Sequence, residues 1–129
     1  MKKYAAILFS LFCSVGFAKA QQVFNIRGKL LAEVKENKFY DDKKNLRFYV
    51  DGVFVYNAEN TLIGKIDGPL LYDGQGRQIG RIEGNNMYDA LGRQSGVIVG
   101  DNIHDTYNRP FRRTRGLTKK QIALYFYYF

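Results

Sequence analysis

Residues 70–84, LLYDGQGRQIGRIEG, are the clearest copy of a sixteen-residue unit that repeats without slipping through most of the chain. The preceding copy, residues 53–68, reads VFVYNAENTLIGKIDG. Each unit is marked by an aromatic side chain, followed by Asp or Asn, at Phe24, Tyr40, Tyr56, Tyr72 and Tyr88, with His104 in the sixth place. A glycine comes twelve residues after the aromatic at Gly52, Gly68, Gly84, Gly100 and Gly116, and Glu36 is the exception. Units this short cannot bury their own apolar faces and must stack on their neighbours, so the repeat decides the architecture.

Two turns divide each unit. Asp73 begins a tight turn that ends at Gly76, because an Asp or Asn side chain can accept a hydrogen bond from the backbone two residues on, and Gly tolerates the left-handed conformation at the fourth position. The turn from Asp41 to Lys44 lacks that glycine, and we expect it to be looser. A second turn at pairs such as Asp67-Gly68 closes the unit. Two turns leave strands of roughly four and six residues, so each unit is predicted to be one antiparallel hairpin.

Two apolar columns recur with the repeat and mark the predicted core. One lies just before the aromatic and the other ten residues after it: Phe39, Val55, Leu71, Met87 and Ile103, and Val34, Val50, Ile66, Ile82 and Ile98. Glycines recur on the face of the second column, at Gly64, Gly80 and Gly96. A glycine inside a strand permits a bend or the close approach of another backbone, which indicates that the hairpins converge towards a shared axis.

Short strands, unequal arms and a fixed period favour an all-β fold built as a closed or radial ring of hairpins. Closure removes the exposed strand edges that invite aggregation. An open β-solenoid made of the same unit is the alternative. We predict one repeat domain over residues 21–116, with five or six copies of the unit.

Residues 117–129 break the repeat. Thr118 to Gln121 has the form of a capping box, which predicts a helix, whereas the aromatic run that follows is typical of a strand. We predict a short helix that plugs the ring, because a segment apolar on every side must be buried. An aromatic C-terminus also resembles the last strand of an outer-membrane barrel, but the strands here are about half the nine to eleven residues that spanning requires.

Residues 1–20 have the order of a signal peptide. Lys2 and Lys3 precede an apolar run, and Ala18-Lys19-Ala20 has the form of a cleavage site. We therefore expect an exported protein, periplasmic or extracellular, that begins near Gln21 and has no further transmembrane span. The only cysteine, Cys13, is lost with the signal, and one histidine remains, so we expect no metal site and no cofactor.

The positive charge is concentrated in one segment. The formal net charge is +8, and loss of three signal-peptide lysines lowers it to +5. Six basic residues then lie within residues 109–120, with no acid among them: Arg109, Arg112, Arg113, Arg115, Lys119 and Lys120. A charge this local argues against a general nucleic-acid-binding role. The four arginines are candidates to bind lipopolysaccharide phosphates, anionic glycans or an acidic partner, and the alternative is a solvated link between ring and plug.

The tyrosine column offers a second candidate site. Tyr72 and Tyr88, flanked by carboxylates and amides, have the chemistry to stack on sugar rings. The alternative is that tyrosines beside a turn pack on cross-strand neighbours and satisfy their hydroxyls locally.

No arrangement typical of a catalytic site is present. The aspartates at the turns, such as Asp73 and Asp89, are equivalent by repeat and are explained by turn formation, whereas glycoside hydrolysis needs two carboxylates in different environments. His104 has no serine or cysteine at a recognisable spacing. We predict no catalytic residues and no enzymatic activity.

The two quoted units, with the aromatic C-terminus, resemble the bacterial β-flower proteins over residues 24–129. The resemblance implies a small exported protein with a four- or five-fold pseudo-symmetric ring of hairpins, and no established activity. Two segments depart from the pattern, DDKK at residues 41–44 and RPF at residues 109–111. Together these features predict a non-enzymatic binding or structural module of the bacterial envelope that recognises an anionic surface, or alternatively a glycan.

Overall fold

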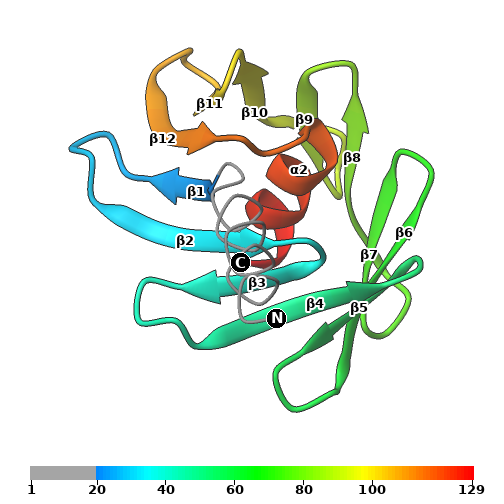
Figure 1. The fold of residues 1–129 in the computed structure, drawn as a ribbon. Helices are drawn as coiled ribbons and strands as arrows, with labels where there is room; N and C mark the ends of the chain where they lie inside the picture. Colours follow the sequence, from blue (N-terminus) through cyan, green and yellow to red (C-terminus); the bar gives the residue numbers. More distant parts are fainter. Residues whose placement is uncertain (1–19) are drawn as a thin grey trace, which may run out of the picture.

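A computed structural model describes residues 20–129, which form a closed ring of twelve antiparallel strands around one helix (Figure 1). The predicted signal peptide lies outside the described residues, apart from Ala20. The elements are β1 (Gln21–Phe24), β2 (Leu30–Lys35), β3 (Lys38–Asp41), β4 (Leu46–Asp51), β5 (Phe54–Asn57), β6 (Leu62–Asp67), β7 (Leu70–Asp73), β8 (Gln78–Glu83), β9 (Asn86–Asp89), β10 (Gln94–Val99), β11 (Asn102–His104), β12 (Pro110–Arg115) and α2 (Lys119–Tyr128). The all-β ring is confirmed.

Every strand pairs with its neighbours in sequence, and β12 returns to pair with β1. This closure excludes the open solenoid. The strands make six hairpins through the turns that begin with Asp or Asn, from β1–β2 to β11–β12, and five through the tight turns, from β2–β3 to β10–β11. The β12–β1 pair occupies the sixth place of the second series, where the two ends of the domain meet.

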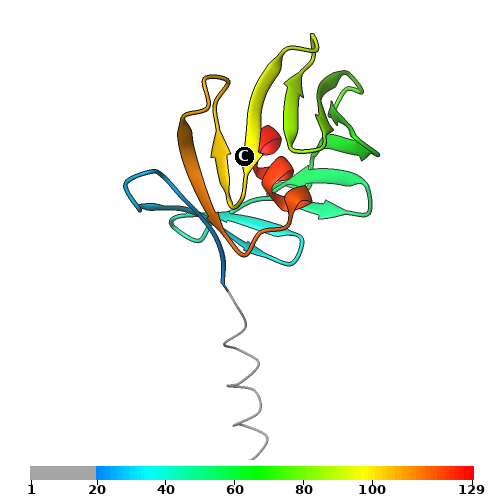
Figure 2. The same ribbon diagram turned by 90° about the horizontal axis from the view of Figure 1, so that it is seen from above.

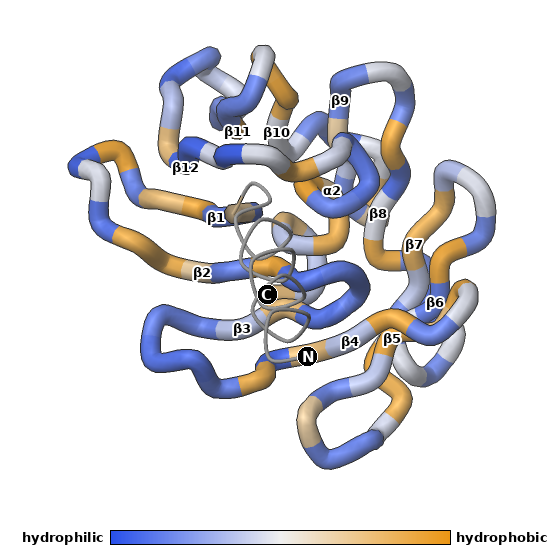
Figure 3. Tube along the Cα trace, viewed as in Figure 1, coloured by the Kyte–Doolittle hydropathy of each residue, from blue (hydrophilic) through white to orange (hydrophobic). Residues whose placement is uncertain are grey.

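The longer turns have the predicted chemistry. One Oδ1 atom of Asp73 accepts hydrogen bonds from the backbone N–H groups of Gln75 and Arg77, both at 2.9 Å, and Gly76 adopts a φ of +85°. The turn at Asp41 makes the same bonds to residues 43 and 45, with Lys44 at a φ of +67°. The expectation of a looser turn there is wrong, because Lys44 adopts the left-handed conformation without glycine. In Figure 3 the hydrophilic stretches gather in these outward turns, above all between β3 and β4.

The tight turns link adjacent hairpins into the ring. The Ile66 N–H donates to the Val53 carbonyl at 2.8 Å, and the Ile82 N–H donates to the Pro69 carbonyl at 2.9 Å. Each bond joins the end of a six-residue strand to the tight turn that precedes it by one hairpin. A bulge recurs as well: Val55 pairs with Gly64 and Tyr56 with Leu62, which leaves Ile63 unpaired. Bulges bend strands, so their repetition around the ring supplies its curvature.

The apolar columns form the core. The column before the aromatic is buried, and Phe39 stacks on Phe48 with ring centroids 4.2 Å apart. In the second column Val34, Val50 and Ile98 are buried, while Ile66 and Ile82 are only half-buried. The predicted core is therefore confirmed, with one incompletely covered sector.

The C-terminal segment is the helix α2, which lies inside the ring (Figure 2). Its capping box is present: the Thr118 hydroxyl accepts from the Gln121 N–H at 3.1 Å, and the Gln121 side chain accepts from the Thr118 N–H at 2.9 Å. Ile122 to Tyr125 are buried. The helical plug is thereby confirmed. At ten residues, this helix falls short of what is needed to cross a membrane, and the described part of the chain has no other.

The strand glycines receive the aromatic rings of α2. The rings of Tyr128, Tyr127 and Phe126 lie where side chains at Gly64, Gly80 and Gly96 would project. The Tyr128 and Tyr127 hydroxyls then donate to the carbonyls of Tyr72 and Tyr88, both at 2.7 Å. The close approach expected at these glycines is real, but it comes from side chains of the plug and not from another backbone.

Candidate functional site

Strand alternation divides the basic segment over both faces of β12. Successive side chains of a strand point to opposite faces, so Arg112 faces the helix, while Arg113 and Arg115 face outward and are exposed. Lys119 and Lys120 lie on the first turn of α2, beside the tight turns β4–β5 and β6–β7. The six basic residues therefore do not form a single patch.

Arg109 belongs to the repeat. Its Nε atom lies 3.0 Å from Oδ2 of Asp105, as Arg77 lies 2.9 Å from Asp73 and Arg93 lies 3.0 Å from Asp89. The pKa of the Asp105 carboxyl is lowered, chiefly by the hydrogen bond from the Arg109 backbone N–H. Arg109 therefore stabilises its own turn through the ion pair with Asp105. Its equivalence to Arg77 and Arg93 is readable in the sequence as an Asp followed by Arg four residues later.

Arg112 is a packing residue. It occupies the inward repeat position held by Gly96 one unit earlier and Gly80 two units earlier. Its Nε donates to the Tyr125 hydroxyl at 3.3 Å, and its Nη1 donates to the Phe111 carbonyl at 2.8 Å. The guanidinium also lies 5.1 Å from the centre of the Phe111 ring. Three other units have a glycine at this position, which leaves room for an aromatic ring of α2, whereas this unit contacts the helix with a guanidinium.

Arg113 and Arg115 line an outward groove of about 520 Å³ at the closure of the ring, with Phe24 and Asp101. The Arg115 guanidinium lies 5.6 Å from the centre of the Phe24 ring. Within residues 20–129, neither arginine is within ion-pair distance of a carboxylate. Two cations on one strand face are therefore available to an anionic ligand, and we call the outward surface of β12 around them the β12 face.

Tyr72 and Tyr88 lie on the outer surface, half-buried, on β7 and β9. The Arg81 guanidinium covers the Tyr88 ring at 4.3 Å, and Tyr56 stacks on Tyr49 at 5.4 Å. Tyr88 and Tyr56 thus pack on cross-strand neighbours. The hydroxyls of Tyr72 and Tyr88 are not satisfied locally, because among the described residues neither hydroxyl donates or accepts a hydrogen bond.

The turn aspartates and His104 form hydrogen bonds within separate turns around the ring. Each aspartate accepts hydrogen bonds from backbone N–H groups of its own turn, which lowers the pKa of Asp41, Asp73, Asp89 and Asp105. His104 Nδ1 lies 2.9 Å from the Asn108 side-chain oxygen. Residues 20–129 contain no group of three side chains placed to hold a metal ion.

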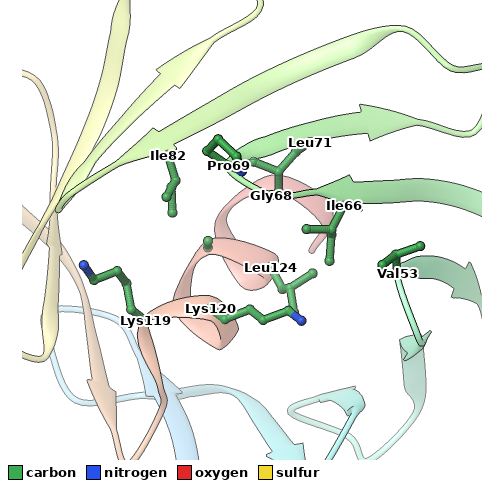
Figure 4. Close-up of a pocket in the computed structure, with 10 residues that line it drawn as sticks. Val53, Ile66, Gly68, Pro69, Leu71, Ile82, Lys119, Lys120 and Leu124 are labelled. Carbon is green, nitrogen blue, oxygen red and sulfur yellow. The ribbon is translucent and has the colours of Figure 1, made fainter.

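A cavity beside α2 was not anticipated from the repeat. It has a volume of about 360 Å³ and lies between the start of the helix and the tight turns β4–β5 and β6–β7 (Figure 4). The sequence does contain a signal for it. The residues after the turn glycines are apolar here, at Val53 and Pro69, whereas the equivalent residues of later units are polar, at Asn85 and Asp101.

Neither the curated proteins nor the solved structures gave a match to this chain. One family model matches residues 20–129, which is the whole described ring with its plug, and its description is 5-fold beta-flower protein. The chain belongs to the 5-fold beta-flower family.

Proposed function

We propose that this protein is an exported, non-enzymatic binding module of the bacterial envelope that recognises an anionic component through the β12 face. The observation that carries the proposal is the pair of exposed arginines, Arg113 and Arg115, on one face of β12 with no carboxylate paired to them in residues 20–129. Arginine binds phosphate and carboxylate groups in bidentate geometry, which suits lipid A phosphates, phosphoglycerol groups or acidic sugars.

The neighbouring strands extend this positive sector. β12 is followed around the ring by β1, β2 and β3, and Lys35 of β2 pairs with Lys38 of β3, both exposed. Glu33 in the same sector is neutralised by Lys44 at 3.2 Å, and Asp101 is the carboxylate that lines the groove itself. The sector therefore has a net positive charge on its outer surface, which attracts anions at low ionic strength.

The test is binding of the purified protein to phosphatidylglycerol vesicles and to isolated cell envelope, at low and high salt. Arg113→Glu should weaken binding at least tenfold at low salt. Lys65→Glu is the matched control, because Lys65 occupies the same outward repeat position three units away, is also exposed and changes the charge equally. Binding unaffected by salt, or weakened equally by both variants, would overturn the proposal.

A second candidate is glycan recognition through Tyr72 and Tyr88. The observation in its favour is that both rings are on the outer surface and that neither hydroxyl forms a hydrogen bond within residues 20–129. It predicts binding of envelope polysaccharide that is insensitive to salt and lost in Tyr72→Ala and Tyr88→Ala while the melting temperature holds. Tyr56→Ala, one unit before Tyr72, is the control, and equal loss in all three variants would count against a defined sugar site.

Export itself has a direct check. Cell fractionation and N-terminal sequencing should place the protein outside the cytoplasm, with Gln21 as its first residue. Retention of residues 1–20 in the cytoplasmic fraction would contradict the envelope assignment.

A further inference from the structure

The cavity beside α2 lies where the plug leaves the ring incompletely sealed. Ile66 and Ile82, from β6 and β8, are half-buried on its wall, although the repeat-equivalent Val50 and Ile98 are buried. Leu71 and Leu124 complete an apolar interior, and Figure 4 shows these side chains arranged around one space. An apolar cavity of about 360 Å³ is within the size range of small-molecule sites.

The turn residues at the cavity differ from those elsewhere in the ring. Val53 and Pro69 follow the glycines of two adjacent tight turns, and both line the cavity. The same place in the other tight turns is polar, with Asn37, Asn85 and Asp101. Val53 is 45% exposed. The sequence thus places solvent-exposed apolar residues at the two turns that line this opening.

Two ammonium groups flank the opening. Lys119 and Lys120 both line the cavity, and Figure 4 shows their nitrogen atoms at its two sides. Lys119 Nζ donates to the Gly84 carbonyl at 3.0 Å, which bonds the helix to the tight turn between β8 and β9. Among the described residues that line the cavity there is no carboxylate. The site therefore combines an apolar interior with a cationic rim.

We propose that this cavity binds a single-chain amphiphile, with an acyl chain against Ile66, Ile82 and Leu124 and its carboxylate at the rim that carries Lys119 and Lys120. At about 30 Å³ for each water-sized group, the volume accommodates roughly twelve such groups, which fits a medium-length chain. The lysines select an anionic head group over a neutral or cationic one. This site is separate from the β12 face, so it stands or falls independently of the proposed function.

The probe is decanoate, compared with decanol and decyltrimethylammonium at concentrations below micelle formation. In two-dimensional amide NMR of the purified protein, decanoate should shift the signals of Val53, Gly68, Ala123 and Leu124. It should bind at least tenfold more tightly than decanol, and decyltrimethylammonium should bind least. Absence of these shifts, shifts centred elsewhere, or equal binding of decanoate and decanol would overturn the proposal.

Two variants locate the site. Val53→Asn with Pro69→Asn gives these turns the residue found at Asn37 and Asn85, so the ring should remain intact while decanoate affinity falls at least tenfold. Val99→Asn is the control, because Val99 is 44% exposed and lies outside the cavity. Lys119→Gln with Lys120→Gln should abolish the preference for decanoate over decanol, whereas Lys38→Gln with Lys65→Gln should leave it. Unchanged affinity in the turn variant, with its melting temperature preserved, would also overturn the proposal.

Discussion

The phenol ring of Tyr128 fills the space into which a side chain at Gly64 would project. The two residues are 64 positions apart in the sequence and belong to the plug and to β6. A methyl group at residue 64 would overlap the ring, whose hydroxyl is held by the Tyr72 carbonyl at 2.7 Å. The helix can therefore dock in this position only because residue 64 is a glycine.

Gly64→Ala should lower the free energy of unfolding by about 1–3 kcal/mol, the usual cost of overpacking a core. Gly96→Ala should cost less, because its nearest contact, the Phe126 ring, would be 3.1 Å away. Chemical denaturation measures both. In a double-mutant cycle with Tyr128→Ala the Gly64→Ala penalty should largely vanish, and a penalty that persists in full would show that the ring is not its cause.

Alanine substitutions at Arg112 and Arg113 should differ in their effect on stability, because Arg112 faces the helix and Arg113 lies on the outer face. Arg112→Ala removes bonds to the Tyr125 hydroxyl and the Phe111 carbonyl, and should cost about 1–2 kcal/mol. Arg113→Ala, on the outer face, should stay within about 0.5 kcal/mol of the parent. Urea unfolding curves give both values, and similar losses in the two variants would contradict the assignment of Arg112 to the inward face.

The turn aspartates should make the fold sensitive to acid. Hydrogen bonds from the backbone, first from the N–H four residues on, lower the pKa of Asp73 and Asp89 in the folded state. A lowered folded pKa contributes stability above the unfolded value of about 4, and that contribution is lost as the pH falls through the folded pKa. The melting temperature should therefore drop below about pH 4.

Replacing Asp41, Asp73, Asp89 and Asp105 by Asn should reduce this fall of the melting temperature at low pH. Asparagine keeps the accepting oxygen, as Asn25 and Asn57 do in their own turns. Melting temperatures between pH 2 and pH 7 test the claim. An acid transition of unchanged size in the fourfold variant would assign the sensitivity to other carboxylates.

Tyr128 should make the fold sensitive to alkali. Burial raises the pKa of its hydroxyl from 10.0 to about 12. A raised folded pKa means that the stabilisation is complete below pH 10 and is lost as the pH rises from 10 towards 12. Tyr128→Phe should weaken this dependence and cost about 1 kcal/mol at neutral pH through the lost hydrogen bond to the Tyr72 carbonyl. Denaturation at pH 8 and pH 11 compares the two proteins, and an alkaline loss identical in both would refute the assignment.

The ring was predictable because its causes are local. The Asp73 to Gly76 turn, the Asp67-Gly68 turn and the column containing Leu71 are each specified within one unit and repeated. The helix was predictable from the Thr118 to Gln121 capping box against the β-propensity of the aromatic run. The turn at Lys44 differs from the prediction because a lysine adopts a left-handed conformation when the surrounding hairpin imposes it.

The candidate site was only partly predictable because its residues depend on strand register. A run of arginines reads as one patch in the sequence, yet alternation places Arg112 and Arg113 on opposite faces, and the repeat assigns Arg109 to Asp105. The cavity near Val53 depends on where the plug lies in the ring, and no pattern within one unit encodes that position. The sequence indicates the cavity only when units are compared, because Val53 stands where other units have Asn37 and Asn85.

The closure of the ring by β1 and β12 also sets an order of events for a chain that is synthesised from its N-terminus. Strands β2 to β11 find both partners among the segments that emerge next to them, whereas β1 waits for β12, and α2 emerges after that. A chain truncated before residue 110 has neither the closing strand nor the plug, and it leaves two ladders of backbone groups open to proteases and to other chains. Emergence of β12 and α2 is thus the event that closes this ring, because until then β1 and β11 each have an unpaired edge.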